Sequence, residues 1–316
     1  MSAGAKLAVV AIGGNSLIRD QDHQSIPDQY ETVTVTVRQI SDMIEAGWNV
    51  IVTHGNGPQM GFILRRSELA IHEVPPVPMD YAGADLQGSI GYMFVKAFHN
   101  EFRRRGIRRE PVAVVTEILV DRNDPAFSEP SKPIGSYMDE AKAKALAAAQ
   151  GWSVKEDARR GWRRVVASPV PRQIIDSQAI NQLARSGFVV IGCGGGVPVI
   201  EDENGDLAGI EAVIDKDLAS SLLARSIGAD LFMIATGVER VAIDFNTPRQ
   251  RWLDRMTVSD ARRYYAAGQF DKGSMGPKIT AMVEFLEAGG KQALITNPPN
   301  IANALAGVSG TLVVLG

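Results

Sequence analysis

The chain has 316 residues, of which 45% are hydrophobic and 22% are charged, and its formal net charge is −3 at pH 7. This balance is typical of a globular protein with a large core. The small negative charge gives no support to binding of nucleic acid or of an acidic membrane, and no apolar segment reaches the length of a membrane span.

Cys193 is the only cysteine in the sequence. It excludes an intrachain disulfide and is compatible with a reducing compartment, so we expect a cytoplasmic protein. Because Cys193 lies in an apolar run before glycines, we interpret it as a buried small hydrophobe rather than a nucleophile.

An apolar run over residues 7–12 predicts a buried parallel strand, and it leads directly into Gly13, Gly14 and Asn15. Paired glycines after a strand allow backbone amides to approach a phosphate, although a plain tight turn has the same sequence. The spacing matches neither a P-loop nor a dinucleotide-binding fingerprint, which disfavours a dinucleotide oxidoreductase.

A helix is predicted over about residues 28–46, and an apolar strand over residues 49–53. That strand opens into His54-Gly55-Asn56-Gly57-Pro58-Gln59, a dense turn whose amides can hold a small polar substrate. His54 taken alone is more often a packed histidine than a catalytic base. A helix over residues 83–102 and one strand over residues 111–120 follow.

The composition changes from residue 121 to about residue 167, where proline, asparagine and charged residues replace the regular apolar patterns of strands and helices. We interpret this segment as a subdomain that protrudes from the main sheet, carries Lys132 at its base and moves as a lid. The alternative is a surface loop in which Lys132 has no functional role. Two arginine clusters, within residues 103–109 and 159–164, are interpreted as solvated faces.

After this segment strands and helices alternate again, with a helix predicted over residues 174–186 and a strand over residues 188–191. The strand ends in the densest glycine loop of the chain, residues 192–198, which indicates close approach of the backbone to a ligand and includes Gly194 and Gly195. Further strands are predicted over residues 230–235, 241–245, 291–296 and 311–315, and helices over 256–268 and 279–288. This alternation predicts a mainly parallel, doubly wound sheet with ligands beyond the carboxyl ends of its strands.

Ile214-Asp215-Lys216-Asp217-Leu218 places a lysine between two aspartates at a helix entrance. Positive backbone ends and an oriented lysine suit an anionic phosphate, whereas a charged first helical turn is the simpler alternative. The chain has ten lysines against twenty-three arginines, so lysines in glycine- or aspartate-rich turns stand out. Those lysines are Lys132, Lys216 and Lys278.

Taken together and in order, these stretches resemble the carbamate kinases of the amino acid kinase superfamily. The resemblance covers almost the whole chain. It rests on Gly13-Gly14-Asn15, Thr53-His54-Gly55-Asn56-Gly57-Pro58-Gln59, Asn123-Asp124-Pro125 with Lys132-Pro133-Ile134-Gly135, Ile214-Asp215-Lys216-Asp217, Thr236-Gly237-Val238 and Gly273-Ser274-Met275-Gly276-Pro277-Lys278.

The resemblance implies an α/β fold, a three-layer αβα sandwich with a mainly parallel open sheet, and a homodimer. It implies that an N-terminal part (residues 1–205, with the protruding subdomain at about 121–167) binds the acceptor and a C-terminal part (residues 206–316) binds the nucleotide. The implied catalytic residues are Lys132, Lys216, Lys278 and Asp217; the phosphate- and nucleotide-binding residues are Gly13, Gly14, Asn15, Thr236, Gly237, Val238, Met275 and Gly276; the acceptor-binding residues are Gly55, Asn56, Gly57, Gly194 and Gly195.

The implied reaction is reversible phosphoryl transfer between ATP and carbamate, in arginine metabolism, with Mg²⁺ held by phosphate and water rather than by protein ligands. Two alternatives stay open: a kinase of the same fold for another small carboxylate or phosphonate, and a nucleotide-binding regulator without turnover. Leu86 and residues 22–30 depart from the family pattern on the acceptor side. Of the two aspartates, we expect Asp215 to cap the helix and Asp217 to orient the lysines.

Overall fold

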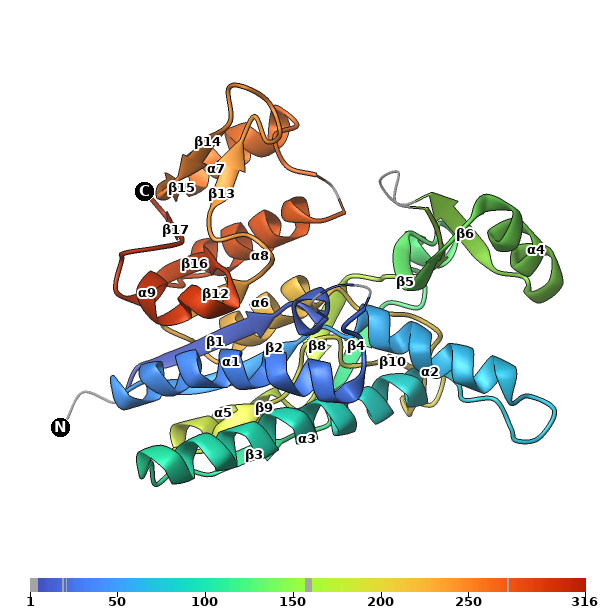
Figure 1. The fold of residues 1–316 in the computed structure, drawn as a ribbon, viewed down its shortest axis with the longest axis horizontal. Helices are drawn as coiled ribbons and strands as arrows, with labels where there is room; N and C mark the ends of the chain where they lie inside the picture. The colour runs from blue at the N-terminus through green and yellow to red at the C-terminus, as the bar shows by residue number, and fades with distance from the viewer. Residues whose placement is uncertain (1–4, 19, 21, 157–160, 272) are drawn as a thin grey trace.

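The computed structural model describes residues 5–18, 20, 22–156, 161–271 and 273–316 (Figure 1). Its centre is an eight-stranded sheet with the order β15-β17-β16-β12-β1-β2-β9-β3. Within the described residues only β16 and β17 pair antiparallel in this sheet, so the predicted mainly parallel sheet is confirmed. The strands are β1 (Leu7–Ile12), β2 (Asn49–His54), β3 (Pro111–Ala113), β9 (Val189–Ile191), β12 (Leu231–Ala235), β15 (Arg255–Thr257), β16 (Gln292–Thr296) and β17 (Thr311–Val314).

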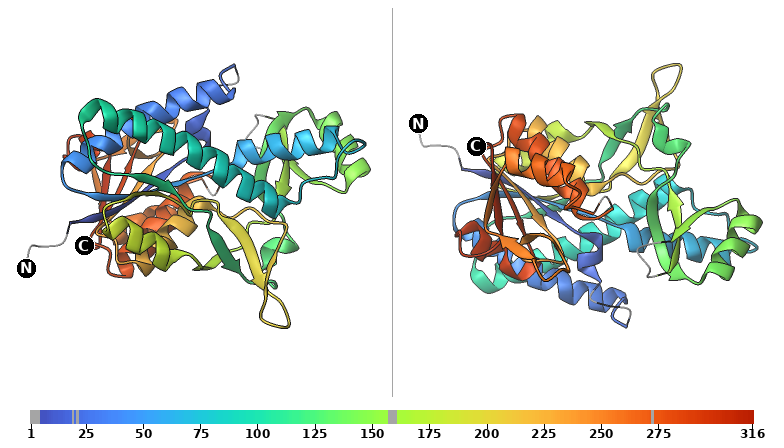
Figure 2. Two further views of the ribbon diagram at one scale, coloured as in Figure 1. Left: turned by 90° about the horizontal axis from the view of Figure 1, so that it is seen from below. Right: turned by 90° about the horizontal axis from the view of Figure 1, so that it is seen from above.

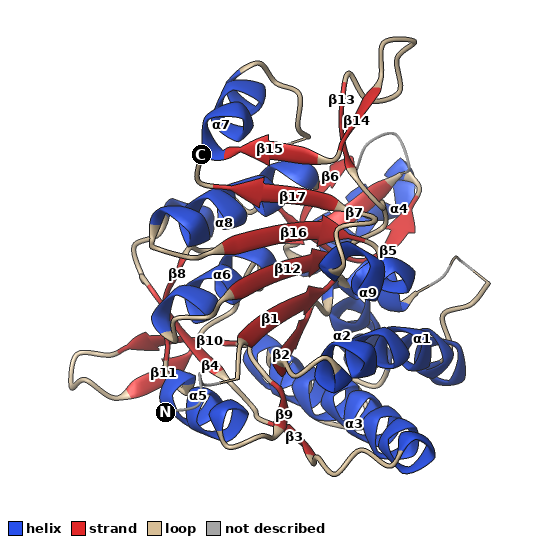
Figure 3. Cartoon of the chain, turned by 90° about the vertical axis from the view of Figure 1, so that its left-hand side faces the viewer, coloured by secondary structure: helices blue, strands red, loops and turns tan. Residues whose placement is uncertain are grey.

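Helices cover both faces of this sheet, which gives the expected three layers (Figures 2 and 3). Strand β1 shows the reason, because every one of its residues is buried and successive side chains enter opposite layers. One layer contains α1 (Ile26–Glu45), α2 (Gly57–Leu69), α3 (Met79–Arg105) and α9 (Ile301–Leu305), and the other contains α5 (Ser177–Arg185), α6 (Lys216–Ser226), α7 (Val258–Ala266) and α8 (Met275–Glu287).

The prediction of a single strand over residues 111–120 is wrong, because β3 is followed by a separate strand that belongs to a second sheet. Gln87 binds the backbone between the two strands: its side chain donates to the Thr116 carbonyl (3.2 Å) and accepts from the Thr116 N–H (2.9 Å). Val114 N–H still donates to the Ile191 carbonyl of β9 (2.8 Å), whereas the Thr116 carbonyl accepts from Val197 N–H of the second sheet (2.8 Å), so the chain passes from one sheet to the other here. The second sheet has the order β11-β10-β4-β8, with β4 (Glu117–Val120), β8 (Pro171–Ile174), β10 (Val197–Glu201) and β11 (Leu207–Gly209).

A three-stranded sheet of order β5-β7-β6 projects to one side of the main body (Figures 1 and 2). It comes from the segment in which the composition changes, and it carries Lys132 as the first residue of β5. Movement of this subdomain as a lid, and a division of the chain at residues 205 and 206, stay predictions. The subdomain contains η2 (Pro125–Phe127), β5 (Lys132–Met138), α4 (Glu140–Gln150), β6 (Ser153–Glu156) and β7 (Trp162–Val166).

The interpretation of the second arginine cluster as a solvated face is wrong for Arg163 and Arg164; Arg159 and Arg160 lie outside the described residues. Arg163 is 8% exposed, and its guanidinium carbon lies 5.2 Å from the centre of the Tyr137 ring. The guanidinium of Arg164 lies 4.8 Å from the Trp152 ring centre. The aromatic rings of the small sheet cover these arginines, a packing that charge alone does not predict.

Helix α2 was not predicted, because the glycines and proline at its start indicated only a turn. Pro58 lies in its first turn, where the missing N–H costs no helical hydrogen bond. Cys193 is buried as expected, and burial raises its thiol pKa to about 12. In the part of the chain that the structure describes, none of the helices has the length and apolar character needed to cross a membrane.

Candidate active site

Three glycine-rich loops meet at the carboxyl ends of β1, β2 and β9, which are neighbours in the main sheet. Backbone hydrogen bonds connect them: Gly55 N–H donates to the Ile12 carbonyl (2.9 Å), and Gly195 N–H donates to the His54 carbonyl (3.2 Å). Gly13 N–H donates to the carbonyl of Ala235 at the end of β12 (3.2 Å). The predicted loops therefore form one continuous surface at one edge of the sheet.

The glycines in these loops have a packing role that the sequence analysis did not recognise. A Cβ atom on Gly55 would lie 2.8 Å from the Gly14 nitrogen and 3.1 Å from Cδ of Lys216. At Gly194, where φ is +80°, a Cβ atom would lie 2.1 Å from the His54 carbonyl oxygen. Glycine is thus required for one loop to contact the next and for the Lys216 side chain to pass beside Gly55.

The three lysines singled out in the sequence converge on two aspartates. Lys216 and Lys278 each donate to one carboxylate oxygen of Asp217, the latter at 2.9 Å. Lys132 donates to Oδ2 of Asp215 at 2.5 Å. These lysines belong to α6, α8 and β5, so the tertiary structure brings together three elements far apart in the chain. Three ammonium groups against two carboxylates leave a net positive charge, which suits an anion.

Asp215 has two functions, which corrects the expectation that it would serve only as a cap. Its Oδ1 accepts hydrogen bonds from the N–H groups of Asp217 (2.9 Å) and Leu218 (3.3 Å), as an N-cap should. Its other oxygen holds Lys132. No local sequence pattern indicates the second contact, because Lys132 lies 83 residues away in the chain.

Burial and charge determine the protonation of this cluster. Burial alone would raise the pKa of Asp217, but Lys216 and Lys278 hold it well below its usual value. For Lys278 burial alone would lower the pKa, and the attraction of Asp217 raises it above its usual value. Burial, together with repulsion from Lys278, lowers the pKa of Lys216 despite its contact with Asp217. An incoming phosphate would stabilise the charged form of Lys216 and relieve this repulsion.

The other residues that were predicted to bind the nucleotide or its phosphates belong to three different segments. Met275 and Gly276 are the first two residues of α8, and Lys278 is the fourth. Thr236, Gly237 and Val238 connect β12 to β13 (Val241–Ile243), and among the described residues they make no hydrogen bond to the three lysines. The backbone of Asn15 lies in a short 3-10 helix, whereas its side chain is outside the described part of the structure.

Two buried polar atoms, one at the end of β2 and one in the first turn of α2, have no hydrogen-bond partner among the described residues, namely His54 Nδ1 and Gln59 Oε1. Gln59 Nε2 donates to Gln29 Oε1 (3.0 Å), and Gln29 Nε2 donates to the Gln24 carbonyl (2.8 Å). The segment that departs from the family pattern therefore contacts the first turn of α2 through Gln59. Leu86, the other departure, is buried in the apolar layer that contains α1 and α3.

The described side chains of the candidate site do not form a set of ligands for a metal ion. Among the described residues, no three His, Cys, Asp or Glu side chains are grouped as metal ligands. Both oxygens of Asp217 already accept from lysines. These residues fit a metal that is held by the phosphates of a nucleotide and by water.

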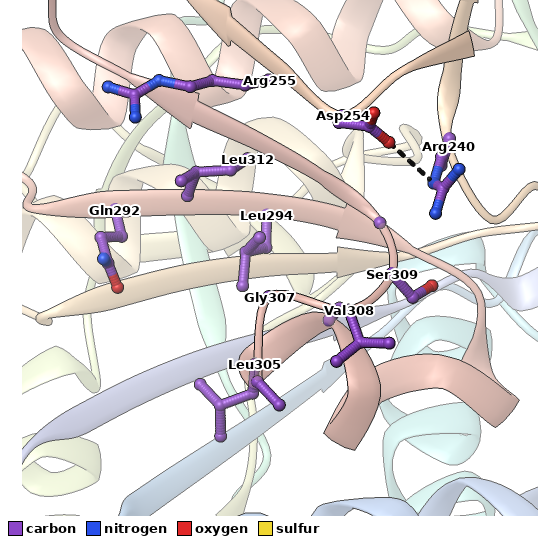
Figure 4. A pocket seen from close by; sticks show the side chains of 13 residues that line it. Arg240, Asp254, Arg255, Gln292, Leu294, Leu305, Gly307, Val308, Ser309 and Leu312 are labelled. Atoms are coloured by element: carbon purple, nitrogen blue, oxygen red, sulfur yellow. Dashed lines mark ion pairs between the residues drawn. The ribbon is translucent and has the colours of Figure 1, made fainter.

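A cavity of about 630 Å³ lies elsewhere, between the faces of β16 and β17 and the segment that connects α9 to β17 (Figure 4). Arg240 and Asp254 form an ion pair at its rim (3.3 Å), and Leu294 and Leu312 line its floor. None of the residues predicted for the site lines this cavity. Its volume alone therefore does not make it the active site, and the charged cluster is the stronger candidate.

His54 makes the stability of the fold dependent on pH. Burial lowers its pKa from 6.5 to about 4, while its ring stacks on Phe94 with centroids 6.3 Å apart. Since the folded-state pKa is depressed, His54 imposes no penalty above pH 6.5, and stability is lost as the pH falls towards 4. We expect the free energy of unfolding to fall by up to roughly 3 kcal/mol in this window.

Denaturant unfolding at several pH values measures this loss. His54→Gln cannot titrate and should flatten the profile between pH 6.5 and 4, whereas His99→Gln, at an exposed position, should leave it unchanged. An equal acid loss in His54→Gln and in the parent protein would assign the effect to other groups.

The fold and the charged cluster define a class of phosphotransferase, and comparison with known proteins gives the family. Residues 6–297 match the sequence model of the amino acid kinase family, and the chain belongs to this family. Within it, the chain is a carbamate kinase-like phosphotransferase.

Two relatives illustrate the similarity over full length. The carbamate kinase of Thermococcus kodakarensis is 48% identical over 313 residues, which cover 98% of this chain and 99% of the relative. A carbamate kinase-like protein of Escherichia coli is 46% identical over 313 residues, which cover 98% of this chain and 99% of that protein. The structure of the Giardia lamblia carbamate kinase bound to AMP-PNP is 39% identical, with full coverage of both chains and a TM-score of 0.91.

Proposed function

We propose that this site transfers a phosphoryl group reversibly between ATP and carbamate. The observation that carries the proposal is the convergence of Lys132, Lys216 and Lys278 on Asp215 and Asp217, beside three glycine loops. A transferred phosphoryl group spreads negative charge over its oxygens, and phosphoryl transfer depends mainly on positioning and charge neutralisation. The names of the relatives support carbamate as the acceptor.

Each group has a role in this mechanism. Lys216 and Lys278 bind the oxygens of the phosphoryl group in transfer, and Asp217 keeps both ammonium groups charged and oriented. Lys132 reaches in from the protruding subdomain. The loop of Gly13, Gly14 and Asn15 surrounds the phosphate, and Gly55, Asn56, Gly57, Gly194 and Gly195 surround the acceptor. Thr236, Gly237, Val238, Met275 and Gly276 hold the nucleotide.

The acceptor needs no general base, because a carbamate oxygen is already ionised at neutral pH and can attack phosphorus directly. Mg²⁺ bound to the nucleotide phosphates would supply further charge neutralisation. A homodimeric assembly and a place in arginine metabolism stay predictions that rest on the resemblance alone.

ATP formation from ADP and carbamoyl phosphate tests the proposal. We expect saturable, Mg²⁺-dependent turnover and a kcat/KM for carbamoyl phosphate well above that for acetyl phosphate and other acyl phosphates. Preference for another acyl phosphate would assign a different acceptor to the same fold. Nucleotide binding without turnover on any member of the panel would indicate a regulator instead.

A further inference from the structure

Helix α2 and strand β5 cross in direct backbone contact at two glycines. A Cβ atom built on Gly61 would lie 1.9 Å from Cα and 2.3 Å from N of Gly135. Carbon atoms in ordinary contact are roughly 3.5–4 Å apart, so no side chain fits at position 61 without moving one of the two elements. Gly135 has φ of +70°, a left-handed conformation that also favours glycine.

This crossing lies between two parts of the candidate site. Helix α2 begins at Gly57, immediately after the loop in which Gly55 packs beside Lys216. Strand β5 begins at Lys132, three residues before Gly135. Ile134, next to the crossing, is buried in the same apolar cluster as residues of α2. One rigid helix therefore contacts the loop at its first turn and the lysine-bearing strand one turn later.

A second contact joins the far end of α2 to the same subdomain. Arg164 of β7 lies with Nη1 at 3.5 Å from Oε1 of Glu68, near the C-terminal end of the helix. Arg164 packs on the Trp152 ring, so its guanidinium is held by the subdomain from the other side. The helix and the subdomain are thus joined at two points along α2.

We propose that α2 sets the position of Lys132 in the active site, with Gly61 as the positioning residue. The close approach at Gly61 and Gly135 brings β5 near enough for Lys132 Nζ to reach Asp215 at 2.5 Å. This inference rests on the proposed catalytic role of Lys132. In the described residues the subdomain sheet shares no ladder with the main sheet, so it can shift as a unit when the spacing to α2 changes.

Gly61→Ala inserts one methyl group into this crossing. Helix and strand must separate by roughly 1.5 to 2 Å, which moves Lys132 away from Asp215. Gly61 lies within α2 and its φ is not positive, so alanine adds no backbone strain and favours the helix itself. A misplacement of about 1 Å can cost about 10²-fold in rate, and we expect kcat to fall about 10- to 100-fold.

The matched control is Gly88→Ala, also in the interior of a helix, where an added Cβ meets no atom within 4 Å. We expect Gly61→Ala to lower kcat with little change in the KM for ADP and in the thermal midpoint, and Gly88→Ala to leave kcat unchanged. Normal kcat in Gly61→Ala, or an equal loss in Gly88→Ala, overturns the proposal.

A double-mutant cycle with Lys132→Ala separates positioning from general damage. If Gly61 acts through Lys132, Gly61→Ala should have no further effect on kcat in the Lys132→Ala background; a multiplicative loss overturns the proposal. Near-normal turnover of Lys132→Ala alone would instead defeat the proposed function at that residue. If Gly61→Ala does not fold, Glu68→Gln decides: it weakens the second contact, kcat should fall about 2- to 5-fold, and an unchanged kcat overturns the proposal.

Discussion

Replacing Lys216 or Lys278 with alanine is expected to lower turnover by about 10²- to 10³-fold, the usual cost of removing one donor to a developing negative charge. Both lysines are held by Asp217, which is 3% exposed, in a region from which water is largely excluded. Their charges act on the transferred phosphoryl group rather than on the fold. The loss should therefore appear in kcat more than in the affinity for ADP.

The fold should survive either substitution, because Asp217 keeps the other lysine as a partner. Steady-state kinetics, thermal melts and calorimetric titration with ADP measure the three quantities on the same samples. Lys291→Ala is the matched control, since this exposed lysine also pairs with an aspartate, Asp230 (2.5 Å), outside the site. Near-normal turnover in Lys216→Ala or in Lys278→Ala would remove that lysine from the mechanism.

Asp217→Asn is expected to cut turnover by about 10²-fold and to lower the thermal midpoint, because two buried ammonium groups lose their carboxylate. The substitution keeps the shape of the side chain but leaves only one oxygen, without charge, for two ammonium groups. Lys216 and Lys278 then lose their common partner, and their repulsion separates them. A turnover near that of the parent protein would show that the lysines are oriented by other contacts.

Asp215 provides the comparison, because its two functions can be separated by substitution. Asp215→Asn keeps an oxygen for the helix cap and removes the charge that holds Lys132, so turnover should fall less than in Asp217→Asn while the thermal midpoint is kept. Asp215→Ala should lower turnover similarly and also cost about 1 kcal/mol of stability through the lost cap. If the Asp215 variants are the less active ones, the roles of the two aspartates are reversed.

The features that depend on neighbouring residues could be predicted from the amino-acid sequence. Continuous apolar character predicted β1 with its correct bounds, and Asp215 before Lys216 predicted the start of α6. The alternation of strands, glycine turns and helices predicted the parallel sheet and the edge at which the loops meet. Scarce lysines in unusual turns identified the members of the charged cluster. These signals are local, because hydrogen-bonding pattern, capping and side-chain period are set within a few residues.

Which of these residues contact one another depends on how distant elements pack in the folded chain. Lys132 reaches Asp215 across 83 residues of chain, and Lys278 reaches Asp217 across 61. No local pattern contains such a pairing, so Asp215 was expected to serve only as a cap. The same holds for Gln87, which binds the backbone of Thr116 between β3 and β4, and for the contact of Gly61 with Gly135. Each depends on the close packing of separate elements, and the energy of that packing is absent until the whole chain is folded.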